Sequence, residues 1–282
     1  MPVASVDRLS SLCRFGTMLG QRQIFSVAIC VLLANAVATK VIGALAELGP
    51  ANALAAGLGL SWAFWLSFAL CVRLAWLHDD RPARPKDMLI CAACLAAALV
   101  PISPISALAS TVLAFVILFD RGQGVFLKAS AMVLLAISIH LLWSRLLMLV
   151  FVGPVAALDA HMVGLITQTP VQGNMVRFVD GTHRLSILEA CTSVQNASVA
   201  LMLFVAIVRT FRPAPIRSEI YFLAGLFVSV VVINIIRLTL MAQSLKMFEI
   251  VHGDAGWAAI NAIITVNGLL WAAMSVRREI LA

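Results

Sequence analysis

At 282 residues, the chain is 62% hydrophobic and only 12% charged, with a formal net charge of +7. This composition excludes a water-soluble globular domain, in which about a quarter of the residues are charged, and it predicts a polytopic membrane protein. The positive charge does not indicate a nucleic-acid-binding protein, because basic residues gather beside membrane spans and no basic-aromatic face or nucleic-acid motif accompanies them.

Apolar windows of roughly 20 residues predict eight transmembrane helices. They lie near residues 24–45, 53–77, 88–102, 105–119, 125–152, 193–209, 219–242 and 256–276. The expected fold class is therefore an all-α polytopic membrane protein, built as one integral membrane domain over residues 1–282. The arginines that precede the first apolar run are also typical of a signal peptide. Because that run continues past the candidate cleavage site "ANA", we interpret it as a retained first span.

The basic residues favour cytoplasmic N and C termini. With eight spans, 14 of the 20 Lys and Arg residues fall on the side of the membrane that holds the N-terminus. Seven of the carboxylates lie on that side and six lie elsewhere. This asymmetry follows the positive-inside rule. The third and fourth apolar runs, separated by "PISP", could instead form one kinked helix. That merger would place Arg209, Arg212 and Arg217 outside, so we reject it.

Residues 153–190 connect the fifth and sixth spans, and we expect them to form a small cap on the outer face. One part of this segment carries apolar residues at helical spacing, which predicts a helix lying in the membrane interface. These residues are Val155, Leu158, Met162, Leu165 and Ile166. The following stretch, "MVRFVDGTHRLSIL", predicts a β-hairpin around the Asp180-Gly181 turn.

Five of the six cysteines lie in or beside apolar runs, where cysteine behaves as a small hydrophobic residue. They are Cys13, Cys30, Cys71, Cys91 and Cys94. The "CAAC" spacing of Cys91 and Cys94 is that of a redox or zinc pair, but it lacks partner ligands and a βαβ context, so packing is the favoured interpretation.

Cys191 differs from the other cysteines because it directly precedes a predicted helix whose N-cap is Thr192 or Ser193. The unpaired N–H groups and the positive dipole end of a helix stabilise a thiolate at this position. A lone cysteine is most often a buried structural residue, but polar neighbours surround this one. They are Glu189, Thr192, Ser193, Gln195 and Asn196.

The predicted topology brings two further versatile side chains to the same membrane face. Arg237 lies in "NIIRLTL" near the outer end of the seventh span, where a guanidinium is costly unless it snorkels or is paired. Asn234, one turn earlier, shares its helical face. His252 falls in the next outer loop and suits a general base and acid, with Asp254 holding its tautomer.

Taken singly, a snorkelling arginine and a solvated loop histidine are the more ordinary interpretations. Together with Cys191 on one face, they predict a cysteine-based active site in which Arg237 stabilises a thiolate and then an oxyanion. Three charged or titratable residues within other spans are not explained by this site. We expect Lys40 and Arg145 to snorkel, and His140 to form a hydrogen bond between helices.

These residues together resemble the exosortase/archaeosortase family. The resemblance rests on Glu-Ala-Cys entering a helix, Asn-x-x-Arg near the end of the next span, and a histidine with a nearby glycine before the last span; it covers Val155 to Trp271. Members are multispanning membrane proteins thought to be cysteine transpeptidases, and their proposed catalytic residues would fall on Cys191, Arg237 and His252. The usual Cys-Ser-Gly is replaced here by Cys191-Thr192-Ser193, which indicates an atypical branch.

The resemblance implies exported protein substrates whose C-terminal tail consists of a short motif, one transmembrane helix and a basic cluster. Cys191 would attack a peptide carbonyl at the outer face of a prokaryotic cytoplasmic (inner) membrane, among membrane lipids, and transfer the acyl group to an acceptor nucleophile of unknown identity. No metal cluster or phosphate loop is visible in the sequence, so we expect neither a metal nor a cofactor.

Two other functions stay open on the sequence alone. A transporter of small molecules or lipids would place charged or broken helices near the bilayer midplane. A non-catalytic component of an envelope or polysaccharide assembly system would keep the fold without the reaction.

Overall fold

The computed structural model describes residues 20–79 and 81–281, and the chain divides into two compact units, residues 1–138 and 139–282. The predicted cytoplasmic N-terminal tail, with Arg8 and Arg14, lies outside the described residues. Most of the described chain is helical, and one small antiparallel sheet interrupts the helices.

The first unit is built from five α-helices and one short 3₁₀ turn within its described residues. They are α2 (Gln21–Ala55), η1 (Gly57–Gly59), α3 (Trp62–Trp76), α4 (Pro85–Ala98), α5 (Ser103–Phe119) and α6 (Val125–Ser138). The separation of α4 and α5 confirms that the third and fourth apolar runs are two helices. Pro104 lies in the first turn of α5, where its missing N–H leaves no hydrogen bond unmade.

The second predicted span is shorter than expected, because α2 continues through part of it. A kink at Gly49, with φ of +72°, precedes Pro50, and the helical run then extends to Ala55. The next helix begins only at Trp62, where the Ser61 side chain accepts a hydrogen bond from the Phe64 N–H at 3.3 Å. A glycine supplies the left-handed backbone that a side chain would disfavour, so the chain bends at this point and the helix resumes.

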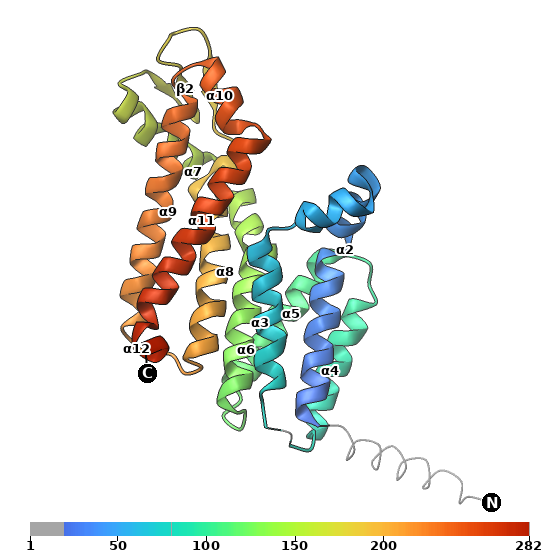
Figure 1. The fold of residues 1–282 in the computed structure, drawn as a ribbon. Coiled ribbons are helices and arrows are strands. Elements are labelled where there is room, and N and C mark those ends of the chain that lie inside the picture. Colours follow the sequence, from blue (N-terminus) through green and yellow to red (C-terminus); the bar gives the residue numbers. More distant parts are fainter. Residues whose placement is uncertain (1–19, 80, 282) are drawn as a thin grey trace, which may run out of the picture. The chain divides into compact units, whose positions relative to one another are not determined.

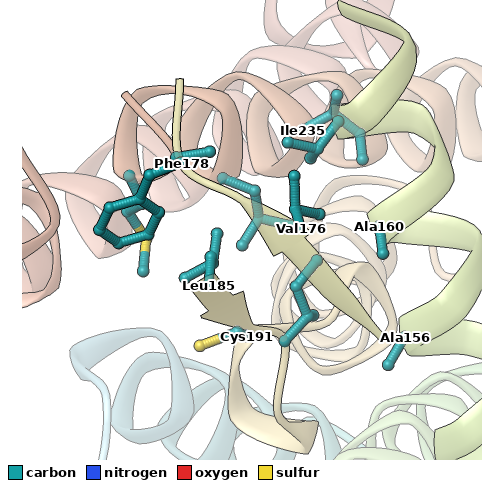
Figure 2. Packing of buried hydrophobic residues seen from close by; sticks show 12 residues of the cluster. Ala156, Ala160, Val176, Phe178, Leu185, Cys191 and Ile235 are labelled. Atoms are coloured by element: carbon teal, nitrogen blue, oxygen red, sulfur yellow. The ribbon is translucent and has the colours of Figure 1, made fainter. Parts of the chain in front are cut away.

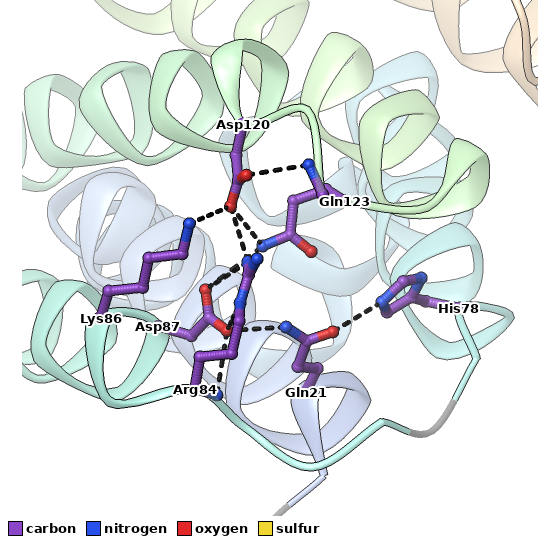
Figure 3. Close-up of polar contacts among 8 residues, drawn as sticks. Gln21, His78, Arg84, Lys86, Asp87, Asp120 and Gln123 are labelled. Carbon is purple, nitrogen blue, oxygen red and sulfur yellow. Dashed lines mark hydrogen bonds and ion pairs between the residues drawn. The ribbon is translucent and has the colours of Figure 1, made fainter.

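A cluster of polar side chains joins the helix ends of the first unit, and Figure 3 shows its contacts. The Arg84 guanidinium donates to both carboxylate oxygens of Asp87, at 2.8 and 2.9 Å, and to Asp120 at 2.6 Å. Gln21 donates to Asp87 at 2.6 Å and shares a hydrogen bond with His78. We call this set the helix-end cluster; its members are Gln21, His78, Arg84, Lys86, Asp87, Asp120 and Gln123.

The second unit begins with a π-helical turn and contains the cap and the last predicted spans (Figure 1). Its helical elements are η2 (Ile139–Trp143), α7 (Ser144–Thr167), η3 (Glu189–Cys191), α8 (Ser193–Phe211), α9 (Glu219–Met241), α10 (Leu245–His252), α11 (Asp254–Ser275) and α12 (Arg277–Leu281). Helices α8, α9 and α11 lie side by side and pack through Phe204, Leu226 and Ile264.

The predicted hairpin is confirmed, and a third strand extends it. Strand β2 (Met175–Arg177) pairs antiparallel with β3 (Arg184–Ser186) around Asp180-Gly181, and β1 (Val171–Gln172) pairs with the other edge of β2. Gly181 takes a φ of +74°, which glycine adopts without strain. Hairpin turn chemistry is local, and it is therefore readable from sequence.

The residues predicted to form a helix in the cap are helical, but they do not form a separate helix. Residues 155–166 form the second half of α7, which runs without a break through Pro154 to Thr167. Proline removes one helical hydrogen bond but does not end a helix when the apolar pattern continues on both sides. The helix ends where Gln168 adopts a left-handed φ of +55°.

Five helical segments of the described chain are long and apolar enough to cross a membrane. They are Gln21–Ala55, Val125–Thr167, Ser193–Phe211, Glu219–Met241 and Ala255–Ser275, and the shorter apolar helices are Trp62–Trp76 and Ser103–Phe119. A span needs about 20 apolar residues to cross the hydrocarbon core. The architecture is that of a multi-pass helical membrane protein.

Candidate active site

Cys191 is the last residue of the 3₁₀ turn η3 and lies directly before α8, as the sequence predicts. Its N–H donates to the Leu188 carbonyl at 2.9 Å, which closes the turn. Helix α8 begins at Ser193, so the positive end of its dipole is next to this residue. The cysteine is therefore next to a helix N-terminus, as predicted, but the Ser193 N–H at this terminus is paired with a carboxylate of α7.

The N-terminus of α8 is capped by Asp159 of α7, which the sequence analysis did not identify. The Asp159 carboxylate accepts hydrogen bonds from the Ser193 N–H and the Ser193 hydroxyl, each at 3.0 Å. Thr192 occupies the N-cap position, but its hydroxyl donates to the Glu189 carbonyl at 2.8 Å instead. A signal was present in the sequence, because Asp159 is the only carboxylate between Asp120 and Asp180.

Asn234 fixes the cysteine turn to α9. Its side-chain N–H₂ group donates to the Cys191 carbonyl at 2.9 Å and to the Ser193 hydroxyl at 3.2 Å. Its side-chain oxygen accepts from the Asn196 amide at 3.0 Å. Buried amides need such partners, because each unmade hydrogen bond costs about 1–3 kcal/mol. These contacts bring four of the predicted site residues, together with Asp159, into one polar network.

The Cys191 side chain is only 6% exposed and belongs to an apolar cluster. Figure 2 shows its sulfur beside Leu185 of the cap, with Ala156 and Ala160 of α7 in the same cluster. Phe178, which follows β2, also packs here, and the Val179 N–H donates to the Ala242 carbonyl at the end of α9, at 2.9 Å. The cap thus covers the sulfur.

Arg237 lies one turn beyond Asn234 on α9 and is 5% exposed. Within the described residues no hydrogen bond or ion pair involves its side chain, and its Nε atom is buried without a partner. The side chain lines a cavity of about 540 Å³ whose other walls are apolar residues of α9, α10 and α11. An unpaired buried guanidinium is costly in an apolar environment and is therefore often functional.

The predicted loop position of His252 is wrong, because it is the last residue of α10. Helix α10 starts at a Ser244 N-cap, whose hydroxyl accepts from the Met247 N–H at 3.3 Å. The exposed imidazole stacks on Phe248, with ring centroids 4.9 Å apart, and Phe248 packs against the Cys191 cluster. The predicted partner Asp254 starts α11, but its side chain lies outside the described part of the structure.

The structure joins some of the predicted residues directly and others only through neighbours. Cys191, Ser193, Asn196 and Asn234 share the polar network, whereas Arg237 is linked to it along α9 and His252 through Phe248. Among the described residues no hydrogen bond joins the side chains of Cys191, Arg237 and His252 to one another. Their catalytic roles stay predictions.

Glu189 and Gln195 line a different cavity from Arg237. It measures about 640 Å³ and lies between α7, η3 and α8, with Arg145, Leu149 and Leu188 completing its lining. Glu189 is exposed there, two residues before the cysteine. The polar neighbours of Cys191 thus divide into a buried network on one side and an open cavity on the other.

Among the described residues, no group of three or more His, Cys, Asp or Glu side chains could hold a metal ion. No protein-family model, characterised protein or solved structure matches the chain. The geometry of the second unit is therefore the basis for a functional proposal.

Proposed function

We propose that the protein is an exosortase-like cysteine transpeptidase or peptidase of the prokaryotic cytoplasmic (inner) membrane. It would cleave the C-terminal sorting signal of exported proteins at the outer face and pass the product to an acceptor. One arrangement carries the proposal: Cys191 precedes the α8 N-terminus, and its carbonyl is held by Asn234 of α9. One turn further along α9 lies Arg237, which has no partner among the described residues.

The chemistry assigns one role to each side chain. The Cys191 thiolate would attack a peptide carbonyl carbon, and Arg237 would stabilise the oxyanion that forms. His252 would give a proton to the leaving amine as the C–N bond breaks, which leaves a thioester on Cys191. Attack on this thioester by an acceptor amine or by water releases the sulfur, so transpeptidation and hydrolysis use the same residues.

The buried sulfur requires the cap to open before a substrate reaches it. Residues of the cap and of α10 meet at this cluster, since Phe178 belongs to it and its ring lies against that of Phe248, with ring centroids 6.5 Å apart. Lids that exclude water and open for substrate are common in enzymes with hydrolysable intermediates. The arrangement supports a gated thiol.

The test is to trap the thioester. The full-length protein is expressed with exported proteins that end in a short motif, a transmembrane helix and a basic cluster, and adducts are identified by intact-protein mass spectrometry. We expect an adduct that hydroxylamine releases, that Cys191→Ala abolishes and that Cys94→Ala leaves unchanged. Normal processing of such proteins by Cys191→Ala would overturn the proposal.

A transporter is the second candidate, and a buried histidine favours it. His140 lies in the π-helical turn η2 within a long apolar helix, and its Nδ1 shares a hydrogen bond with the Ser198 hydroxyl at 2.9 Å. π-Helical turns and intramembrane titratable groups concentrate at functional sites. Uptake or export that survives Cys191→Ala but is lost in His140→Phe would favour this candidate.

A further inference from the structure

The cavity of about 640 Å³ between α7, η3 and α8 carries opposite charges that the catalytic proposal does not use. Arg145 projects from an apolar helix, and Glu189 begins the cysteine turn. Gln195 of α8 and the two leucines complete the lining. The other two large cavities of this unit, of about 660 and 540 Å³, are lined mainly by apolar side chains.

Arg145 and Glu189 line the same cavity without pairing. Both side chains are exposed, and no ion pair or hydrogen bond joins either of them to another residue that the structure describes. Arg209 and Arg212 of the same unit, by contrast, are matched, because both bind Glu219 and Arg212 also binds Glu279. An arginine and a glutamate that face one space unpaired are complementary to a ligand that carries both charges.

We propose that this cavity binds the acceptor, a molecule with a primary ammonium group beside an anionic group. Glu189 binds the ammonium, Arg145 binds the anion, and the Gln195 amide supplies a further hydrogen bond. This assignment rests on the proposed function, which requires an acceptor. It also explains an arginine in an apolar helix, where an unpaired cation is otherwise unfavourable.

Glu189 and Cys191 begin and end one 3₁₀ turn, which has three residues per turn, so their side chains leave it in different directions. Glu189 lines the cavity, whereas Cys191 lies in the apolar cluster under the cap. In this proposal, opening of the cap connects the acceptor in the cavity with the thioester before transfer. Glu189 takes one proton from the ammonium, and the free amine attacks the thioester carbon. The C–N bond forms and the C–S bond breaks. The second amine proton passes to the departing thiolate, so the transfer releases one proton overall.

The test measures binding in full-length Cys191→Ala protein in phosphatidylcholine nanodiscs, because binding does not depend on thioester chemistry. Three probes are titrated calorimetrically: glycylglycine, which carries both charges; glycylglycinamide, which carries the ammonium alone; and N-acetylglycylglycine, which carries the carboxylate alone. We expect glycylglycine to bind at least about tenfold more tightly than either single-charge probe, equivalent to about 1.4 kcal/mol.

Two variants identify the partner of each charge. Glu189→Gln weakens glycylglycine and glycylglycinamide by about tenfold or more and leaves N-acetylglycylglycine unchanged, whereas Arg145→Gln weakens the two carboxylate probes. Glu249→Gln, which removes an exposed carboxylate of α10 outside the cavity, changes none of the affinities. Equal affinities for the three probes, or equal effects of Glu189→Gln and Glu249→Gln, overturn the assignment.

The same ligand chemistry can come from a soluble peptide or from a lipid headgroup. Nanodiscs that contain an aminophospholipid separate the two sources: displacement of glycylglycine assigns the acceptor to the membrane, and undiminished binding assigns it to solution. Failure of all probes and of the aminophospholipid overturns the acceptor site. If the probes bind as expected but no thioester forms on Cys191 in the unmodified protein, the transpeptidase proposal fails and the binding site stands.

Discussion

The charged groups of the two units are arranged in opposite ways. In the helix-end cluster of the first unit, Arg84 and Lys86 face Asp87 and Asp120 through ion pairs of 2.6–3.0 Å (Figure 3). In the second unit, Arg237 is buried, like Asp87, but has no acidic partner among the described residues. A matched cluster holds helices together, whereas an unmatched buried cation is more readily explained by a charge that forms during a reaction.

Replacing Arg237 is the strongest test of this difference between the two units. Replacement by Met keeps the apolar contacts of the stem and removes the charge, so we expect thioester formation to fall about 100-fold to 1,000-fold, the usual effect of losing one oxyanion donor. Thermal stability in detergent should be unchanged or higher, because no partner is left unpaired. Arg217→Met, at an exposed position, is the matched control. A large loss of stability in Arg237→Met would make it a structural residue.

Arg84→Met should have the opposite effect: a large loss of stability and little change in thioester formation by the second unit. It leaves the Asp87 carboxylate, which is 1% exposed, without its main cationic partner. Breaking a buried pair on one side typically costs about 3–5 kcal/mol, and the remaining amides of Gln21 and Gln123 place the expected loss near the lower figure. The melting temperature reports this loss. The double variant Arg84→Met with Asp87→Leu should recover part of it, and failure to recover would indicate that steric packing dominates.

Asp159 lies between these extremes, because its carboxylate caps a helix and also orients the cysteine turn. Asp159→Ala removes both hydrogen bonds to Ser193, and we expect a loss of about 1–2 kcal/mol, typical of an N-cap. Asp159→Asn keeps one acceptor oxygen and should recover most of the stability and of the thioester yield. Equal yields in Asp159→Ala and the unmodified protein would show that the cap does not orient Cys191.

The smallest expected effect is a loss of stability of the first unit at acidic pH. The hydrogen bond from Lys86, reinforced by those from Arg84 and the Gly122 N–H, lowers the pKa of Asp120 to about 2. A carboxyl whose pKa is lower in the folded state contributes stability that is fully present above its unfolded value of about 3.9 and is lost as the pH falls toward 2. The melting temperature, measured from pH 6 to pH 2.5, should therefore fall more steeply with decreasing pH below about pH 4. Asp120→Asn should remove that part of the dependence; an unchanged profile would contradict it.

The sequence predicts where the helices lie, because long apolar runs mark them. Among the described residues, five helices are long and apolar enough to cross a membrane, and α4, with 14 residues, is not one of them. Each of the eight predicted windows overlaps a helix, and the Asp180-Gly181 hairpin follows from local turn chemistry. The cysteine position before α8 was also predictable, since polar residues give way to apolar ones there. Local sequence is sufficient where the determining interaction is local.

Other features depend on contacts between distant segments, which periodicity does not reveal. Asp159 and Ser193 are 34 residues apart, so the isolated position of Asp159 in an apolar stretch marks it as unusual but does not indicate which helix it caps. The continuation of α7 through Pro154 also conflicts with the usual meaning of proline. Helix α10 has only eight residues, so its Ser244 N-cap was its main local signal. The position of His252 therefore required the structure.

The hydrogen bond from the Val179 N–H to the Ala242 carbonyl couples two parts of the cover. It ties the hairpin to the segment that leads directly into α10, and that helix ends at His252. Lifting the hairpin therefore strains the attachment of the imidazole as well. Exposure of the sulfur and displacement of the imidazole are therefore one movement. Under the proposed mechanism, the cap has to close again on a bound substrate before His252 can protonate the leaving amine, so proteins that do not stay bound would escape cleavage.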